Sequence, residues 1–490
     1  MKKISLSLFI VFCSFLSIAN ITLPRIFGSN MVLQRNKPIM IWGWADAGEK
    51  VTVQFNKQVK KTKAAKDGTW KIELNQEAAG GPFQLVAIGK NTITLENVLV
   101  GEVWICSGQS NMEWPVKNSD SAKREIRESD YPQIRHIKIP RTISATPTKD
   151  ITGGVWQKAD SSTTAEFTAV GYFFARKLFK ELQVPIGLIN TSWGGTMVEA
   201  WTSRESFEKT EEFKDIFSKI PFDSIKAVAD KNAKPVSPNA YPTLLFNGMI
   251  NPIIPFTIKG VIWYQGETNA GRAYQYRKAF PLMIQDWRTR FGQGDFPFYF
   301  VQLASFNSAN GNSAMGSTWA ELREAQTATL SVPNTGMIVT MDIGESKDIH
   351  PRNKQDVGAR LAAIALNNLY NTKIEYSGPV YQSFKTDGNK IILSFTHVDN
   401  GFVVKDKYGY LKGFEIAGAD KKFYYARADI KNNQVTVYSD SVASPVAVRY
   451  GWADDMPEVN LYNKEGFPAS PFRTDTWKGM TDEVRYEIKK

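Results

Sequence analysis

Short stretches in which apolar and polar residues alternate occupy the chain between residues 21 and 99. Such alternation puts every second side chain on one face and is typical of a half-buried β-strand. Turn signals such as Asp67-Gly68 separate the stretches. The stretches are Val51–Phe55, Trp70–Leu74, Phe83–Ile88 and Thr92–Leu95. The pattern predicts a sandwich-like β module over residues 21–99.

From about residue 100 the pattern changes to apolar runs that alternate with amphipathic stretches. The apolar runs, which we predict to be strands, are Val103–Cys106, Ile134–Ile139, Ile186–Asn190, Ile258–Tyr264, Phe298–Leu303 and Met337–Met341. The predicted helices are Phe167–Leu182, Tyr276–Phe291, Trp319–Leu330 and Gln355–Leu369. Pro281 is expected to kink or restart the second helix. Apolar strands that alternate with helices are typical of a parallel sheet covered on both faces. We therefore predict an α/β fold, a doubly wound parallel sheet, over residues 100–372, with a polar surface insertion at Thr202–Pro242.

After about residue 373 the chain returns to short strands. They are Lys390–Phe395, Gly401–Val404, Gln434–Tyr438 and Val446–Tyr450. They show no obvious repeat of the first module. We predict a second β module over residues 373–490.

Residues 1–20 have the pattern of a secretory signal peptide. Lys2 and Lys3 precede the apolar run Ile4–Ile18, and small residues offer a cleavage site near Ala19. This predicts a periplasmic or extracellular protein with no stable membrane insertion after cleavage. An uncleaved N-terminal anchor is the alternative.

Charge and cysteine usage bear on the possible partners and on disulfide bonds. The formal net charge is +11, and loss of Lys2 and Lys3 lowers it by two, to +9. The lysines are scattered and no nucleic-acid motif accompanies them, so we expect a solvated surface and no nucleic-acid partner. Cys13 would leave with the signal, so Cys106 cannot form an internal disulfide and is expected to serve packing.

Four polar clusters each follow a predicted strand of the central sheet. They are Ser110, Asn190–Thr196, Gln265–Asn269 and Asp348–Pro351. The carboxyl ends of parallel strands lie at one edge, and doubly wound sheets bind their ligands there. We therefore expect these clusters to form a single site.

Ser110 stands where a nucleophile is expected, in a tight turn after a buried strand, with Gly108 two residues before it. A serine nucleophile normally needs a histidine base. Of the three histidines, His136 falls in a predicted strand and His397 in the C-terminal module. Only His350 lies at the predicted active edge, which makes Ser110 and His350 the candidate pair.

Three sequence blocks resemble the sialate O-acetylesterases of the SGNH-type hydrolase superfamily. They read G-Q-S-N-M-E-W, W-Y-Q-G-E-T-N and D-I-H-P, and the resemblance extends over the whole chain after the signal. It implies that Ser110 is the nucleophile and His350 the general base. It also implies oxyanion donors from the Ser110 N–H, from a glycine of Gly194-Gly195, which we take as Gly195, and from the Gln265–Asn269 block.

Within that block Gln265 is favoured, because it is the first residue after the strand and its amide can donate. Asn269 is the second choice. Glu267 cannot donate when ionised and is expected to form a salt bridge or hydrogen bonds in the loop. Arg272, Arg323 and Arg352 lie near the same edge, and a guanidinium there can bind a sugar carboxylate bidentately, with Arg323 as the candidate.

One position departs from the superfamily pattern. Many members carry Asp three residues before the histidine, whereas this chain has Lys347 there. Asp348, Asp342 or a backbone carbonyl are the alternatives for orienting His350, and we favour Asp348.

These observations predict a secreted serine carbohydrate esterase that removes O-acetyl groups from sialic acids. No His, Cys and carboxylate cluster has metal-ligand spacing, so neither a metal nor another cofactor is expected. An acetyl esterase acting on plant polysaccharides such as xylan is one alternative. A non-catalytic glycan-binding protein is the other. The pattern leaves the oligomeric state open.

Overall fold

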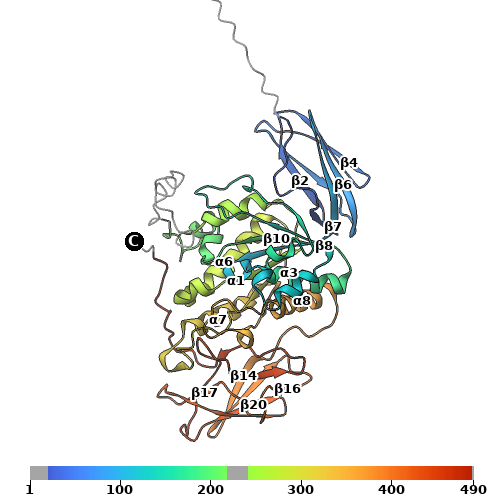
Figure 1. Cartoon of the computed structure of the whole chain (residues 1–490). Helices are drawn as coiled ribbons and strands as arrows, with labels where there is room; N and C mark the ends of the chain where they lie inside the picture. Colours follow the sequence, from blue (N-terminus) through green and yellow to red (C-terminus); the bar gives the residue numbers. More distant parts are fainter. Residues whose placement is uncertain (1–19, 218–240, 488–490) are drawn as a thin grey trace, which may run out of the picture.

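The computed structural model describes residues 20–217 and 241–487. Figure 1 shows an elongated molecule with a β module at each end and an α/β domain between them. The predicted signal segment up to residue 19, and residues 218–240 of the predicted insertion, lie outside the described residues. Within the described ranges, no helix is both long and apolar enough to cross a membrane.

The N-terminal module consists of two β-sheets whose buried side chains alternate along each strand. Its strands are β1 (Val32–Gln34), β2 (Ile39–Trp44), β3 (Lys50–Phe55), β4 (Gln58–Lys63), β5 (Thr69–Leu74) and β6 (Gly80–Ile88). β2 pairs with β5, while β3 pairs with β4 and β6. Val51, Val53 and Phe55 point inward from β3 and are buried. This arrangement agrees with the predicted sandwich-like module.

The central sheet is parallel except at one edge. Its strands are β7 (Thr92–Gly108), β8 (Tyr131–Lys138), β9 (Gln157–Ala159), β10 (Ile186–Ser192), β11 (Gly260–Tyr264), β12 (Phe298–Val301) and β13 (Thr335–Ile338). The order is β13-β12-β11-β7-β10-β8-β9, and only β9 runs antiparallel to its neighbour. Every residue of β10, β11 and β12 is buried, which explains their continuous apolar runs.

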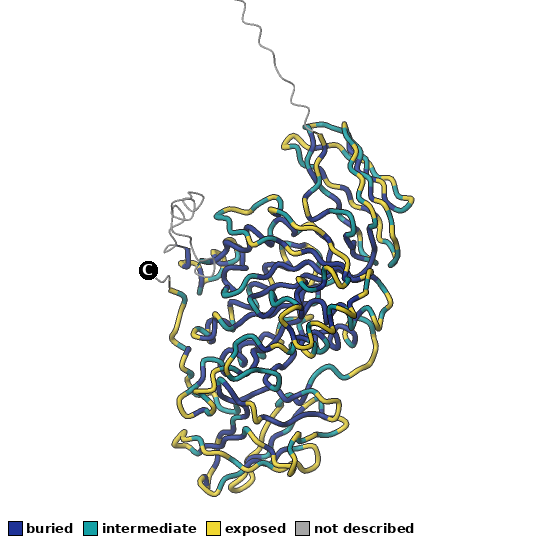
Figure 2. Tube along the Cα trace, in the orientation of Figure 1, coloured by how far each residue is buried: buried dark blue, intermediate teal, exposed yellow. Residues whose placement is uncertain are grey.

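Helices cover both faces of this sheet (Figure 1), and the middle of the domain is buried (Figure 2), which confirms the predicted doubly wound architecture. They are α3 (Ala169–Leu182), α6 (Ala273–Phe291), α7 (Thr318–Ala328) and α8 (Lys354–Tyr370). α3 packs beside α8, and α6 beside α7. Gly171 of α3 lies against Cys106, while Trp263, in register with the next residue of β7, contacts Phe280 of α6 on the other face. α6 continues through Pro281. In the described part of the predicted insertion, residues 202–217 and 241–242, the structure has one short helix, α4 (Arg204–Glu208).

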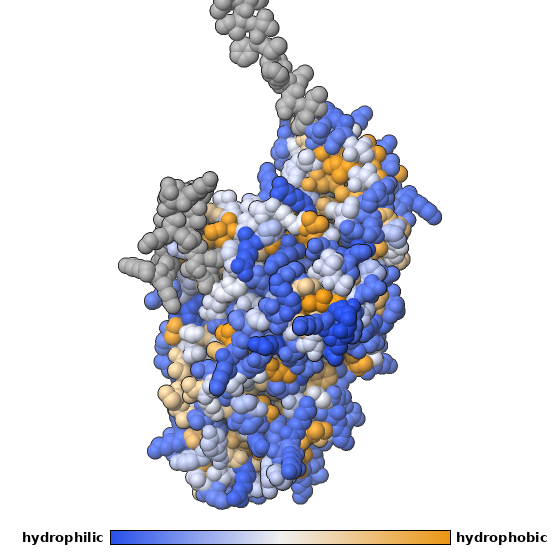
Figure 3. All heavy atoms as spheres, in the orientation of Figure 1, coloured by the Kyte–Doolittle hydropathy of each residue, from blue (hydrophilic) through white to orange (hydrophobic). Residues whose placement is uncertain are grey.

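The C-terminal module contains antiparallel sheets around a hydrophobic core of its own. Its strands are β14 (Val380–Asp387), β15 (Lys390–Thr396), β16 (Phe402–Val404), β17 (Phe414–Ala417), β18 (Phe423–Tyr425), β19 (Arg427–Lys431), β20 (Gln434–Tyr438), β21 (Ala447–Tyr450), β22 (Leu461–Asn463) and β23 (Phe472–Arg473). The face shown in Figure 3 is largely hydrophilic, with hydrophobic residues in small separate groups.

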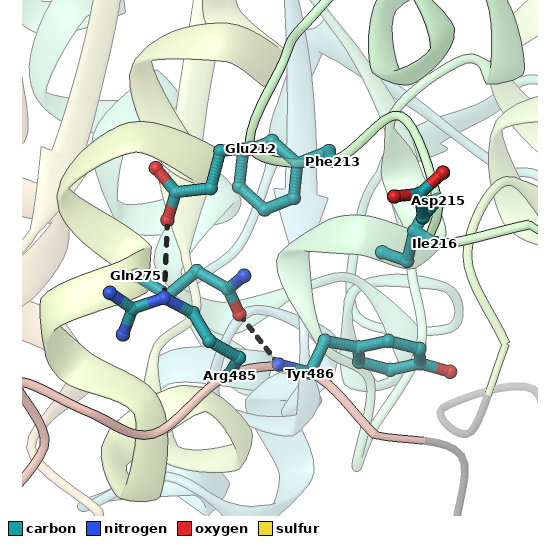
Figure 4. Close-up of a pocket in the computed structure, with 7 residues that line it drawn as sticks. All are labelled: Glu212, Phe213, Asp215, Ile216, Gln275, Arg485 and Tyr486. Carbon is teal, nitrogen blue, oxygen red and sulfur yellow. Dashed lines mark hydrogen bonds and ion pairs between the residues drawn. The ribbon is translucent and has the colours of Figure 1, made fainter.

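The last described residues return from the C-terminal module to the α/β domain (Figure 1). The main-chain N–H groups of Met480 and Thr481 donate to Glu321 of α7 at 2.6 and 3.0 Å. Further along, Tyr486 donates its N–H to Gln275 of α6 at 2.9 Å, beside a small pocket drawn in Figure 4. This segment therefore fastens the end of the chain to two helices of the domain.

Candidate active site

The turn between β7 and the short helix α1 (Ser110–Glu113) places Ser110 at the carboxyl edge of the sheet. Gly108 ends β7 with φ +128°, and an added Cβ there would overlap the main-chain oxygen of Tyr264 in β11. Gln109 donates its N–H to that same oxygen at 2.9 Å. Glycine is therefore required at the point where the strand ends and the nucleophile turn begins.

His350 lies in the loop between β13 and α8 and reaches Ser110. Nε2 of His350 is 2.8 Å from Oγ of Ser110, although 240 residues separate the two along the chain. Trp114, directly after α1, stacks on the imidazole with ring centroids 5.1 Å apart and planes inclined by 16°. The structure thus brings the predicted pair into hydrogen-bonding contact.

Asp348 is close to His350 but does not hold the imidazole through a normal hydrogen bond. Its Oδ1 is 3.6 Å from Nδ1 of His350 and instead accepts the main-chain N–H of that residue at 2.9 Å. Asp342, the second alternative, forms a bidentate pair with Arg360 at 2.7 Å on each arm. The carboxylates proposed from the sequence therefore leave Nδ1 without a hydrogen-bonded orienter.

The environment of His350 favours its neutral form. Burial lowers the pKa of the imidazole from its usual value of 6.5, the charge of Lys354 lowers it further, and Asp348 opposes the shift. A neutral imidazole can accept the proton of a serine hydroxyl. The other two histidines have different settings, because His136 is buried against Phe167 and His397 pairs with Glu375.

The Gly194-Gly195 loop packs directly on Ser110. An added Cβ at Gly194 would lie 3.1 Å from Cβ of Ser110. The N–H of Gly194 donates to Glu113 at 3.0 Å, and Arg141 binds that carboxylate through two nitrogens at 2.9 and 2.6 Å. Gly195 has φ +71°, a conformation that favours glycine.

The amides of Gln265 and Asn269 bond to one another and to their surroundings rather than to Ser110 or His350. Nε2 of Gln265 donates to Asn269 at 2.7 Å and to the carbonyl of Thr196 at 3.2 Å, and its oxygen accepts from Tyr276 at 2.9 Å. Asn269 donates to Glu199 at 2.9 Å. Both N–H groups of Gln265 are engaged, so the predicted oxyanion role does not fit this geometry.

Glu267 lies beside the nucleophile turn and belongs to a buried polar network. It accepts a hydrogen bond from Asn111 at 2.6 Å, and Asn111 accepts one from Lys354 at 2.6 Å. Burial raises the pKa of Glu267 and lowers that of Lys354 to about 7. The hydrogen-bonding role expected for Glu267 therefore agrees with the contacts, with Asn111 as its partner.

Arg323 does not reach the site, which corrects its prediction as a substrate ligand. Its guanidinium is fully buried and donates to the carbonyls of Leu303, Ala304, Ala453 and Asp454. All four hydrogen bonds of this guanidinium go to main-chain oxygens, and two of them join α7 to the C-terminal module. Arg272 pairs with buried Glu199 at 2.5 Å, and Arg352 is exposed.

A pocket of about 260 Å³ opens beside Trp114. Its lining residues are Glu113, Trp114, Pro115, Lys117, Lys138, Arg141 and Glu166. The side chains of Lys138 and Arg141 are 50% and 51% exposed, whereas that of Glu113 is 11% exposed. The pocket therefore presents cations at its rim, next to the ring that covers His350.

Four residues with direct contacts in the site were not predicted from the sequence. Asn111, Glu113 and Trp114 stand in the same block as Ser110, and Lys354 is the first residue of the helix after His350. Their proximity in sequence to Ser110 and His350 was the available signal. Among the described residues, no group of three His, Cys, Asp or Glu side chains is arranged to hold a metal.

Comparison with known protein families decides the classification of the chain. Residues 100–367, more than half of the sequence, match the family model described as carbohydrate esterase, sialic acid-specific acetylesterase. The chain belongs to this family. The family predicted from the three sequence blocks is thereby confirmed, and the chain is a carbohydrate esterase.

Relatives of this esterase match it over nearly its whole length. Sialate O-acetylesterase of Homo sapiens is 32% identical, covering 91% of this chain and 90% of its own. The Mus musculus sialate O-acetylesterase is 31% identical, covering 90% and 92%. A solved structure, a novel carbohydrate acetylesterase from Xanthomonas citri, is 41% identical with a TM-score of 0.85, covering 94% of this chain and 100% of its own. The flanking modules are thus shared with proteins of this type.

Proposed function

We propose that this esterase is exported and removes O-acetyl groups from sialic acids through an acetyl-enzyme on Ser110. The observation that carries the proposal is the 2.8 Å separation of Oγ of Ser110 from Nε2 of His350. A base at this distance can take the hydroxyl proton. The position of Ser110 at the carboxyl edge of a parallel sheet adds to the argument.

The reaction proceeds in two acyl transfers. His350 takes the proton of Ser110 while Oγ attacks the acetyl carbonyl carbon. The N–H groups of Ser110 and Gly195 stabilise the oxyanion, since the N–H of Gly194 is already bonded to Glu113. The bond to the sugar oxygen then breaks, and that oxygen takes the proton from His350. Water attacks the acetyl-enzyme by the same route and releases acetate.

Sialic acids, as opposed to neutral sugars, are supported by the pocket beside Trp114. Lys138 and Arg141 are half-exposed cations there, and both pair with Glu113, Lys138 at 3.5 Å and Arg141 through Nε and Nη2. One carboxylate facing two cations leaves a net positive charge at the pocket. A sialic acid carries a carboxylate that such donors bind. The names of the curated relatives point to the same substrate class.

Hydrolysis of p-nitrophenyl acetate by wild type and Ser110→Ala tests the mechanism. Removing the nucleophile is expected to lower kcat by at least about 1,000-fold. A folded Ser110→Ala protein as active as wild type would show that another group attacks the ester.

The substrate is tested by acetate release from O-acetylated sialic acid and from acetylated xylan at equal acetyl concentration. We expect a higher kcat/KM for the sialic acid. A clear preference for xylan would replace the first proposal by the plant-polysaccharide alternative.

Export is proposed from the pattern of residues 1–20. Sequencing the N-terminus of the protein recovered from the periplasm or the medium tests it. A chain that still begins at Met1 and stays in the cytoplasm would contradict export.

A further inference from the structure

Within residues 20–217 and 241–487, no carboxylate is hydrogen-bonded to Nδ1 of His350. In a serine triad a carboxylate bonded to Nδ1 fixes the tautomer and the direction of the ring. Here Oδ1 of Asp348 lies 3.6 Å from Nδ1, and the Asp348 side chain is 41% exposed. Other contacts must therefore hold the imidazole against Ser110.

Asn111, the residue after the nucleophile, connects the Ser110 turn to the His350 loop. Its Nδ2 donates to the carbonyl of Ile349, directly before His350, at 3.0 Å and to Glu267 at 2.6 Å. Its Oδ1 accepts from Nζ of Lys354 at 2.6 Å. Both amide hydrogens and the amide oxygen are used, and the side chain is 1% exposed.

The partners of Asn111 allow only one orientation of its amide. The carbonyl of Ile349 can only accept a hydrogen bond, and the ammonium group of Lys354 can only donate one. Exchanging the amide oxygen and nitrogen would therefore lose both contacts. A buried side chain locked in this way holds its neighbours at a fixed separation.

Lys354 connects this network to the ring that covers His350. Its side chain is 1% exposed, and Nζ lies 5.8 Å from the ring centroid of Trp114 and 5.4 Å from that of Tyr264. Glu267, Glu345, Asp348 and Asp120 are the acids whose charges act on it. A buried ammonium group needs a hydrogen-bond acceptor, and the amide oxygen of Asn111 supplies one to Nζ of Lys354.

We infer that Asn111, held between Lys354 and Glu267, is a positioning residue that fixes the His350 loop against the Ser110 turn. The inference rests on the proposed function of Ser110 and His350. In this inference a buried amide network holds the imidazole of His350 against Ser110, as a carboxylate bonded to Nδ1 does in a triad. Three residues that take no part in the acyl transfer itself thereby acquire a role.

The test compares Asn111→Ala with Asp348→Asn on p-nitrophenyl acetate. Displacing a catalytic group by about 1 Å typically costs about 100-fold in rate, so Asn111→Ala is expected to lower kcat by about that factor with KM changed less than about threefold. Asp348→Asn keeps an oxygen for the N–H of His350 but removes the charge, and kcat is expected to fall by less than about tenfold. The opposite ranking would overturn the inference.

A second variant serves if Asn111→Ala does not fold. Lys354→Met keeps an apolar stem against the two rings and removes the donor and its charge. Its kcat is expected to fall, and because the Lys354 charge holds down the pKa of His350, the acid limb of kcat/KM is expected to move to higher pH. The shift of the limb reports the loss of the Lys354 charge, whereas the fall in kcat with KM little changed reports the positioning role; a purely structural role would lower thermal stability and leave kcat of the folded protein at the wild-type value.

The outcomes separate this inference from the proposed function. If wild-type hydrolysis does not depend on Ser110, both proposals fail. If it does, and both Asn111→Ala and Lys354→Met keep the kcat of wild type, only the positioning role fails.

Discussion

A single imidazole controls the pH range of the proposed chemistry. Burial lowers the pKa of His350 below 6.5, and only the neutral ring can accept the proton of Ser110. Activity is therefore expected to persist below pH 6.5 and to be lost as the pH falls through the lowered pKa of the His350 imidazole. The measurement is kcat/KM for p-nitrophenyl acetate between about pH 4 and pH 8. An acid limb centred above 6.5 would contradict the burial argument.

Trp114 holds one face of that imidazole. An aromatic pair of this kind contributes about 0.5–1.5 kcal/mol, so Trp114→Leu is expected to lower kcat/KM by up to about tenfold. Trp114→Phe keeps a flat ring over His350 and serves as the matched control. Equal losses in the two variants would show that the bulk of the indole matters and that stacking does not.

At the scale of residues, the sequence predicted which side chains meet but not how they are oriented. Strand ends place Ser110 and His350 at one edge, and the contact between them agrees with that expectation. The amide of Gln265 faces Asn269 and Thr196 because Tyr276, eleven residues later at the start of α6, donates to its oxygen. The burial of Arg323 could not be predicted either, because its hydrogen-bond acceptors are main-chain oxygens, which no sequence motif identifies.

At the scale of elements, the turn from β7 to α1 depends on Gly108. A substituted residue there is forced to φ +128° and meets the oxygen of Tyr264. Gly108→Ala is expected to destabilise the fold by about 1–3 kcal/mol from backbone strain alone and to reduce kcat. Thermal unfolding and ester hydrolysis measure the two effects.

Gly271→Ala is the control for that substitution, because an added Cβ there meets nothing within 4 Å. It is expected to leave the melting temperature close to that of wild type. A similarly small effect for Gly108→Ala would show that the turn can adjust.

Hydrophobic periodicity predicted the elements of the central sheet well, because parallel strands buried on both faces read as unbroken apolar runs. It did not predict the short antiparallel strand β9, whose three residues carry no such run. It also divided β7, since Thr92–Leu95 alternates while Val103–Cys106 is continuous. β7 passes from a half-exposed sheet into a buried one. The hydrophobic pattern changes at that point, so sequence analysis placed a boundary inside a single strand.

At the scale of the whole molecule, β7 belongs to two parts of the chain at once. Its first half pairs with β6 of the N-terminal module, and its second half with β10 and β11 of the central sheet. Glu102, at the junction, is buried and bonds to Arg35 at 2.6 Å and to Gln34 at 2.9 Å. We expect the module and the central sheet to unfold together.

Arg35→Met tests that coupling. It leaves the buried carboxylate of Glu102 without its cation, which typically costs about 3–5 kcal/mol. The melting temperature is expected to fall, with a single calorimetric transition retained for this part of the molecule. The double variant Arg35→Met/Glu102→Leu is expected to recover part of the loss. A separate early transition of the N-terminal module would contradict the coupling.

The burial of Cys106 turns this same strand into a reporter. The thiol is fully buried under Gly171 of α3, and the sequence has no other cysteine after residue 13. A chromogenic disulfide reagent can therefore modify a chain that begins after residue 20 only when the centre of the protein opens. The rate of colour development in native buffer then measures how often β7 becomes exposed in the esterase domain, and no engineered label is needed.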